Sequence, residues 1–271
     1  MASSTSKGER ARDVVREAQT EQEREERKRT HSPSAKRAAE QRVERLSGRS
    51  GIRRVLLENG LVIVMTLFFA VSFVGQVLAG HRVHNQDQRE HGQPTVSVGG
   101  YLRSGAFLEA TAENWESEFL QMGLFVLLTA FLYQRGSSES KTIEEPDAVD
   151  QDPGEARDDP DAPWPVRRGG LWLAIYRNSL GGALLLMFAV AFAAHAYGGA
   201  ADYNESQLQH GGETVSVAGY VATSRFWFES FQNWQSEFFS VAVLVVLSIW
   251  LRQQGSAQSK PVAAPTRDTS E

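Results

Sequence analysis

Cysteine is absent from all 271 residues of the chain. Disulfide bonds, thiolate nucleophiles and Cys-ligated zinc or iron–sulfur sites are therefore excluded. The sequence also contains no glycine-rich phosphate loop, no nucleophile elbow and no zinc-protease helix motif. From these absences we expect a protein that is not an enzyme and that carries no cofactor.

Aromatic residues are missing from the first 54 positions, which carry 15 Lys or Arg against 9 Asp or Glu. Such a segment cannot bury a core, so residues 1–52 are predicted to form a charged, disordered cytoplasmic tail. An anionic-lipid or nucleic-acid patch is the alternative. Interspersed acidic residues and the lack of rings that stack on bases argue against it, and we expect no nucleic-acid partner. No cleavable signal peptide is expected ahead of the apolar runs.

Two further segments are predicted to be disordered. Residues 137–165 contain ten acidic residues, two basic residues and five prolines. We therefore assign 137–168 as an acidic linker and 256–271 as a disordered C-terminal tail. The linker lacks the spacing of an EF-hand calcium loop.

Four uncharged apolar runs stand between the polar segments. Residues 59–80 and 178–201 would each give at least about 33 Å of helix, enough to cross the roughly 30 Å bilayer core. Residues 119–134 and 238–251 would give only about 24 and 21 Å. The pattern predicts an all-α membrane protein with four transmembrane helices. A buried core helix of a soluble protein is the alternative interpretation of each run.

An internal duplication relates the two halves of the chain. Residues 59–141 align with 178–260 without a gap, at an offset of 119, and about two in five of the 83 pairs are identical. We define these ranges as the first half and the second half. Two spans return the chain to the side it left, so 53–136 and 169–255 are predicted to be parallel two-helix repeats about an axis along the membrane normal.

Basic residues near the apolar runs are concentrated on one side of the predicted membrane. By the positive-inside rule, both termini are therefore predicted to be cytoplasmic. The residues on that side are Arg49, Arg53, Arg54, Arg135, Lys141, Arg167, Arg168, Arg177, Arg252 and Lys260, against Arg82, Arg89, Arg103 and Arg225 on the other.

A set of spaced residues occurs in the first half and recurs in the second. The set is Gly80, Asn85, Gln88, His91, Gly92, Trp115, Glu118, Gln134, Gly136, Ser137 and Ser140. This pattern resembles an uncharacterised family of bacterial inner-membrane proteins known as a domain of unknown function, over about 53–141 and again over 171–260 as tandem repeats. The second copy departs from it, with His195 for Gln76, Gln235 for Glu116 and Gln254 for Arg135. The resemblance implies an inner-membrane location and brings no activity.

Glu118 and Glu237 are the repeated carboxylates at the mouths of the short runs. An ionisable residue near hydrocarbon is a functional candidate by default. The two carboxylates are expected at the packed interface between the halves, facing each other as a proton or cation relay. The alternative is a carboxylate favoured by the helix dipole and by headgroup water. Their expected hydrogen-bond partners are Tyr101, Tyr220, His91 and His210.

The neighbouring polar residues complete the candidate site. Trp115 and Trp234 are interpreted as interfacial anchors, with Ser117 and Ser236 in the same zone. Asn114 and Asn233 are expected to satisfy the backbone where each helix begins.

Histidine offers a weaker signal. A metal site built from His91, His210, Glu118 and Glu237 is chemically allowed, but no tight His-x-x-x-His motif is present, so no metal is expected. His195, opposite Gln76, is expected to be a neutral, hydrogen-bonded interhelical residue. Thr95 to Val98 has strand-like alternation, but Ser97 can equally cap a helix.

The sequence thus predicts a multi-pass membrane protein with a structural or envelope-associated role. A small proton or cation pathway is one alternative, and a membrane anchor that recruits a partner through its charged tails is another. The lipid bilayer is the expected partner, with a homo-oligomer or a cytoplasmic protein as further candidates.

The topology can be measured directly because the chain has no cysteine of its own. Each of five variants would carry a single cysteine, and intact spheroplasts of each would be treated with a membrane-impermeant maleimide. The substituted residues are Ser34, Thr95, Ser138, Thr214 and Ser256. We expect labelling at positions 95 and 214 only. Labelling at 138 but not at 95 would refute the predicted orientation.

Overall fold

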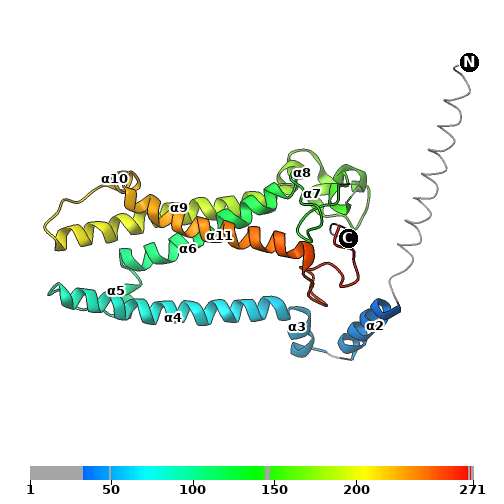
Figure 1. Cartoon of the computed structure of the whole chain (residues 1–271), viewed down its shortest axis with the longest axis horizontal. Coiled ribbons are helices and arrows are strands. Elements are labelled where there is room, and N and C mark those ends of the chain that lie inside the picture. Colours follow the sequence, from blue (N-terminus) through cyan, green and yellow to red (C-terminus); the bar gives the residue numbers. More distant parts are fainter. Residues whose placement is uncertain (1–32, 49, 144–146, 268, 270–271) are drawn as a thin grey trace, which may run out of the picture. The chain divides into compact units, whose positions relative to one another are not determined.

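The computed structural model describes residues 33–48, 50–143, 147–267 and 269 (Figure 1). Every regular element in this part of the chain is a helix, which confirms the predicted all-α class. The chain divides into two units, one ending at Val74 and the other beginning at Gly75. Residues 1–32 of the predicted tail lie outside the described part.

The first unit contains α2 (Pro33–Ser47), α3 (Ile52–Glu58) and the beginning of α4 (Gly60–Glu90). Residues 1–52 were predicted to be disordered, but the structure has helix α2 within this range. Its Ala, Arg and Glu residues have high helix propensity, which composition-based disorder does not weigh. Arg54 donates to Glu58 at 2.6 Å, an exposed pair one turn apart on α3.

The second unit contains the remaining helices. They are the rest of α4, α5 (Val98–Tyr101), α6 (Gly105–Leu128), η1 (Ala148–Asp150), η2 (Pro153–Ala156), α7 (Trp164–Arg168), α8 (Gly170–Tyr176), α9 (Ser179–Gln209), α10 (Val217–Val221) and α11 (Ser224–Trp250). Helix α6 packs most extensively against α9 and also contacts α11 (Figure 1).

A segment that was predicted to be disordered follows each of the two short apolar runs. Both of these segments begin with a defined turn. Ser140 Oγ accepts from the Gln134 backbone N–H at 2.8 Å, and Ser259 Oγ accepts from Gln253 at 2.9 Å. Between these residues, Gly136 and Gly255 have φ of 84° and 82°, a conformation that favours glycine. The acidic linker further contains η1, η2 and α7. The predicted disorder over 137–168 and 256–271 therefore differs from the structure at these positions.

Among the described residues, three helices are long and apolar enough to cross a membrane: α4, α9 and α11. Helix α6 has 24 residues, but four carboxylates interrupt its apolar character. The helices begin about nine residues before the predicted starts at Asn114 and Asn233, because α6 begins at Gly105 and α11 at Ser224. The preceding polar residues also fold as helix, since Ser104 and Thr223 cap the first turns by accepting from Phe107 and Phe226.

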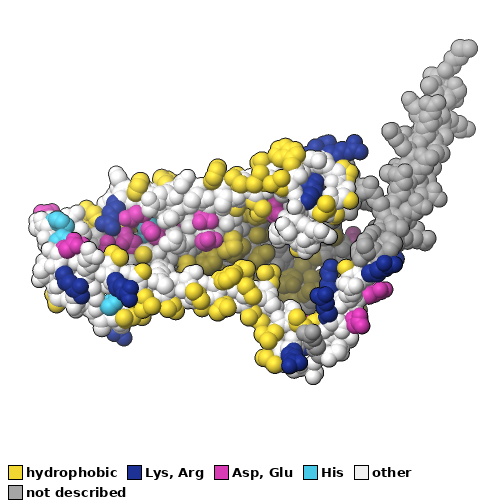
Figure 2. All heavy atoms as spheres, turned by 60° about the horizontal axis from the view of Figure 1, so that its bottom comes forward, with side chains coloured by type: hydrophobic (Ala, Val, Ile, Leu, Met, Phe, Trp, Pro, Cys, Tyr) yellow, Lys and Arg dark blue, Asp and Glu magenta, His cyan; other side chains and the backbone are white. Residues whose placement is uncertain are grey.

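Large apolar side chains are exposed along these helices. Leu61 on α4, Leu186 on α9 and Phe239 on α11 expose 75%, 66% and 69% of their surface. Acidic, basic and His side chains instead gather at the end of the second unit that bears α5 and α10, at the left of Figure 2. Apolar surface of this extent is unfavourable in water and suits contact with lipid.

The same helices occur in both halves at the offset found in the sequence. Helices α4 and α9 begin at 60 and 179, α5 and α10 at 98 and 217, and α6 and α11 at 105 and 224, each 119 apart. The loops are held alike. Asn85 pairs with both the N–H and the C=O of Val96, and Asn204 does the same with Val215, at 2.7–2.9 Å.

The recurring His-Gly pair and the following serine mark where helices stop and start. Gly92 and Gly211 have φ of 68° and 72°, and each follows the last turn of a 31-residue helix. Ser97 accepts from the Gly100 N–H at 3.1 Å and thereby caps α5. Of the two interpretations of residues 95–98, the helix cap is therefore confirmed.

Helices α6 and α9 touch through their backbones. A Cβ at Gly105 would lie 2.6 Å from the Asp202 nitrogen, and one at Gly198 would lie 2.7 Å from the Glu109 nitrogen. Small residues allow this approach, which is typical of helix pairs in membranes. The crossing brings the polar first turns of α6 against the polar second part of α9.

We expect Gly198→Ala to destabilise the second unit, because the added methyl group meets backbone atoms that no rotamer change can move. Thermal unfolding in detergent measures the effect. Gly182→Ala is the matched control, since this glycine of α9 has open space around it. Equal melting temperatures for the two variants would contradict the close crossing.

Candidate functional site

The recurring Asn-Trp-x-Ser strings lie inside helices, so the predicted role of the Asn residues where the helix begins is wrong. Asn114 donates to the Ala110 carbonyl at 2.7 Å, and Asn233 donates to the Glu229 carbonyl at 3.2 Å. Ser117 and Ser236 each donate to the carbonyl three residues earlier at 2.8 Å. These side chains satisfy their own helix, a local role that needs no partner.

Glu118 lies on α6 and Glu237 on α11, and their role as a facing pair stays a prediction. Glu118 is exposed and Glu237 is partly buried. The hydrogen bonds expected from the loop Tyr and His residues are not formed to either carboxylate among the described residues. That part of the prediction is wrong, because Tyr220 instead bonds to Glu109 and Glu229.

His91 and His210 meet across the two halves, with ring centroids 5.3 Å apart. Each Nδ1 also contacts a carbonyl in the last turn of its own helix, Asp87 at 3.0 Å and Ser206 at 2.8 Å. Polar contacts to the last carbonyls of a helix explain why both copies carry His at this position.

A different set of residues forms a charge cluster that is fully buried at its inner end and exposed at Arg225. We call it the buried charge cluster and define it as Glu109, Glu116, His195, Asp202, Tyr220, Arg225 and Glu229. At its inner end, Glu116 and His195 are both fully buried, and His195 Nδ1 lies 2.7 Å from Glu116 Oε2. The Trp234 indole N–H donates to Glu116 Oε1 at 2.9 Å. The expected interhelical hydrogen bond of His195 is thus confirmed, whereas Trp234 does more than anchor an interface.

Tyr220 joins the two carboxylates in the middle of the cluster. Its hydroxyl lies 2.5 Å from Glu229 Oε2 and 3.1 Å from Glu109 Oε1. Burial raises the pKa of Tyr220, and the hydrogen bond to Glu229 raises it further. The phenol is therefore a neutral donor to carboxylates that are held side by side.

Arg225 closes the outer end of the cluster. Its guanidinium donates to Glu229 at 2.7 Å and to Asp202 at 3.1 Å, and it lies 3.4 Å from Glu109. The cluster thus contains four carboxylates, three of them in contact with Arg225, and only one permanent cation. His195 is the only other member that can carry positive charge. A carboxylate excess of this kind calls for protons or a bound cation.

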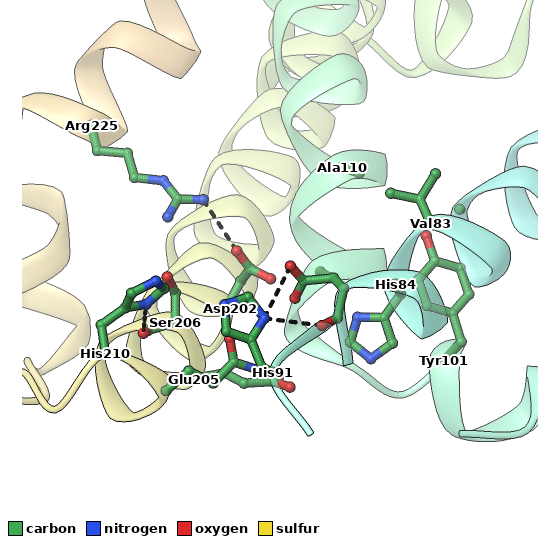
Figure 3. A pocket seen from close by; sticks show the side chains of 14 residues that line it. Val83, His84, His91, Tyr101, Ala110, Asp202, Glu205, Ser206, His210 and Arg225 are labelled. Carbon is green, nitrogen blue, oxygen red and sulfur yellow. Dashed lines mark hydrogen bonds and ion pairs between the residues drawn. The ribbon is translucent and has the colours of Figure 1, made fainter. Parts of the chain in front are cut away.

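A cavity of about 520 Å³ opens beside Arg225 and Asp202. Its wall also carries Asp87, His91 and Glu205 (Figure 3). Ala106 and Ala110 complete part of the wall; they are the counterparts, at the offset of 119, of Arg225 and Glu229. At these two positions the first half therefore has small residues where the second half has charged ones.

The cluster consists mainly of residues that differ between the halves. Glu109, Glu116, His195, Asp202, Arg225 and Glu229 align with Phe228, Gln235, Gln76, Val83, Ala106 and Ala110. Sequence reasoning that followed the identical residues proposed none of these six as a site residue, although it gave His195 an interhelical hydrogen bond. The signal that could have found Glu109, Asp202, Arg225 and Glu229 is an ionisable residue in one half aligned with an apolar one in the other. Tyr220, which matches Tyr101, is the exception.

Over its described residues, the chain is thus an all-α protein with three helices long and apolar enough to cross a membrane and an ionisable cluster where α6, α9 and α11 meet. The chain belongs to the family described as Domain of unknown function (DUF6766), whose model matches residues 52–271 in one stretch through both halves. No curated protein and no solved structure matches the chain.

We expect Glu116→Ala to reduce the free energy of unfolding by about 3 kcal/mol or more, since it leaves two buried N–H donors, of His195 and Trp234, without their acceptor. Gln235→Ala, at the aligned exposed position, should cost less than about 0.5 kcal/mol. Chemical denaturation in detergent measures both. Similar losses in the two variants would show that the cluster does not stabilise the fold.

Proposed function

We propose that this protein is a multi-pass membrane protein that provides a small cation pathway through its buried charge cluster. The observation that carries the proposal is the fully buried Glu116–His195 pair on helices α6 and α9. Ionisable residues at membrane depth are costly, and they mark ion sites and proton relays in helical membrane proteins.

Continuity with the cavity supports a pathway over an isolated structural pair. Arg225 and Asp202 line the cavity and also belong to the cluster. From there, contacts lead through Glu229, to which Tyr220 also bonds, to His195 and then to Glu116. The chain of contacts runs from a polar end of the molecule towards its apolar middle.

The charge balance supports a cation as the species that enters. Glu109, Glu116, Asp202 and Glu229 outnumber Arg225, and burial strengthens their repulsion because the surroundings are less polarisable than water. A cation that lies among them lowers this repulsion. An anion would add to it.

We also propose four transmembrane helices, with α6 as the fourth. Its 24 residues would reach about 36 Å, and its carboxylates at 109 and 116 are covered by α9 and α11, not by lipid. The common offset of 119 supports an origin by duplication and a parallel arrangement of the halves. The distribution of Lys and Arg supports cytoplasmic termini, and the residue pattern supports a bacterial inner membrane as the location.

A purely structural role would need no charge in the interior, and the buried cluster argues against it. A membrane anchor depends on the tails, whose first 32 residues lie outside the described part of the chain. We keep a non-enzymatic role as part of the proposal.

Proteoliposomes containing the full chain test the pathway. Inward movement of H⁺ and of Zn²⁺ would be measured separately, with entrapped pH-sensitive and Zn²⁺-sensitive dyes, under an inside-negative potential. We expect flux of at least one cation, and a loss of about tenfold or more in Glu116→Gln, which keeps the shape of the side chain but removes its charge.

The double variant Glu118→Gln/Glu237→Gln separates the two pairs of carboxylates. If the buried cluster carries the cation, this variant keeps its flux, because neither carboxylate belongs to the cluster. If flux is lost in the double variant but not in Glu116→Gln, the repeated pair Glu118 and Glu237 carries the cation instead of the cluster. Absence of flux of both cations would refute the pathway.

A further inference from the structure

We infer that Glu109, His195 and Glu229 form a binding site for a divalent first-row transition metal such as Zn²⁺. The biological role of this site rests on the proposed cation pathway. The site itself is tested separately, by measuring metal binding. The three residues come from α6, α9 and α11, and one ligand atom of each lies within 4.8 Å of the other two.

An unpartnered nitrogen points to a ligand at this place. His195 is fully buried, and its Nε2 has no hydrogen-bond partner among the described residues. Glu229 Oε2 lies 3.6 Å away, beyond hydrogen-bonding distance although within reach of an ion pair when the imidazole is protonated. A buried ring nitrogen without a partner is uncommon and needs an explanation.

The other side of the imidazole is arranged as it is in known metal sites. Nδ1 bonds to the Glu116 carboxylate at 2.7 Å, which places a proton on Nδ1, so that the neutral imidazole would offer its lone pair on Nε2 to a metal. Trp234 holds Glu116 in turn, at 2.9 Å. A carboxylate–histidine pair of this kind orients the ring and raises its basicity towards a metal.

The donor set selects the class of metal. One imidazole and two carboxylates suit Zn²⁺, Mn²⁺ or Fe²⁺, whereas Mg²⁺ and Ca²⁺ take oxygen ligands and copper(I) takes thiolates or thioethers. Tyr220 and Arg225 each contact both Glu109 and Glu229. They can position both carboxylates without being ligands.

Sequence spacing could not reveal this site, because its ligands lie 86 and 34 positions apart along the chain (195 − 109 and 229 − 195). The expectation that no metal is bound rested on the lack of a short His motif. Three long helices that cross at one depth supply the same chemistry without such a motif.

Zn²⁺ titration of the metal-free, detergent-solubilised full chain tests the inference by calorimetry. We expect one equivalent to bind, and binding at least about 100-fold weaker in His195→Gln, which carries the residue of the aligned position 76. Glu116→Gln should weaken binding about 10- to 100-fold although it is not a ligand. Glu118→Gln is the matched control and should bind as the wild type does.

X-ray absorption on the Zn²⁺-loaded wild type gives a readout that needs no variant. One imidazole among oxygen ligands at about 2.0–2.2 Å is expected. The inference is overturned if no equivalent binds, if two imidazoles are found, or if binding survives His195→Gln and is lost in His91→Gln/His210→Gln. Proton flux without Zn²⁺ binding would refute the metal site and leave the pathway standing. Zn²⁺ binding without flux would refute the pathway and leave the metal site standing.

Discussion

The backbone contact between α6 and α9 is the constraint on which the rest of the second unit depends. Gly105 and Gly198 let the two helices approach until main-chain atoms of one meet the Cα positions of the other. Only at this separation can Glu116 reach His195, and only then does Glu109 lie beside Tyr220. Side chains longer than glycine at the crossing would part the helices and open the cluster to its surroundings. The polar site is thus a product of the smallest residues in the interface.

Burial gives this polar cluster its chemical character. Each carboxylate in it has found a donor, from an indole, a phenol, an imidazole or a guanidinium. Such contacts compensate for lost hydration, yet one Arg cannot neutralise four acids. The cluster can therefore accept positive charge, and its inner end at Glu116 and His195 is fully buried.

The sequence predicted the features that depend on local pattern. It placed the long helices close to their observed positions, recognised Ser97 as a candidate cap and gave His195 an interhelical bond. The starts of α6 and α11 were missed, because a polar stretch can be helical when a neighbouring helix covers it. The cluster was missed because its members come from segments far apart in sequence, and their meeting depends on a glycine crossing that no periodicity encodes.

The cluster is divided between two unlike halves of one chain, much as a site can be divided between the two different subunits of a heterodimer. Glu109 and Glu116 come from the first half, whereas the other five members come from the second. Pairing two copies of either half would give a site with a Gln in place of His195 or a Phe in place of Glu109. The linker avoids these products by keeping unlike halves at a high effective concentration. Joining the halves in one chain therefore determines the composition of the site as well as its location.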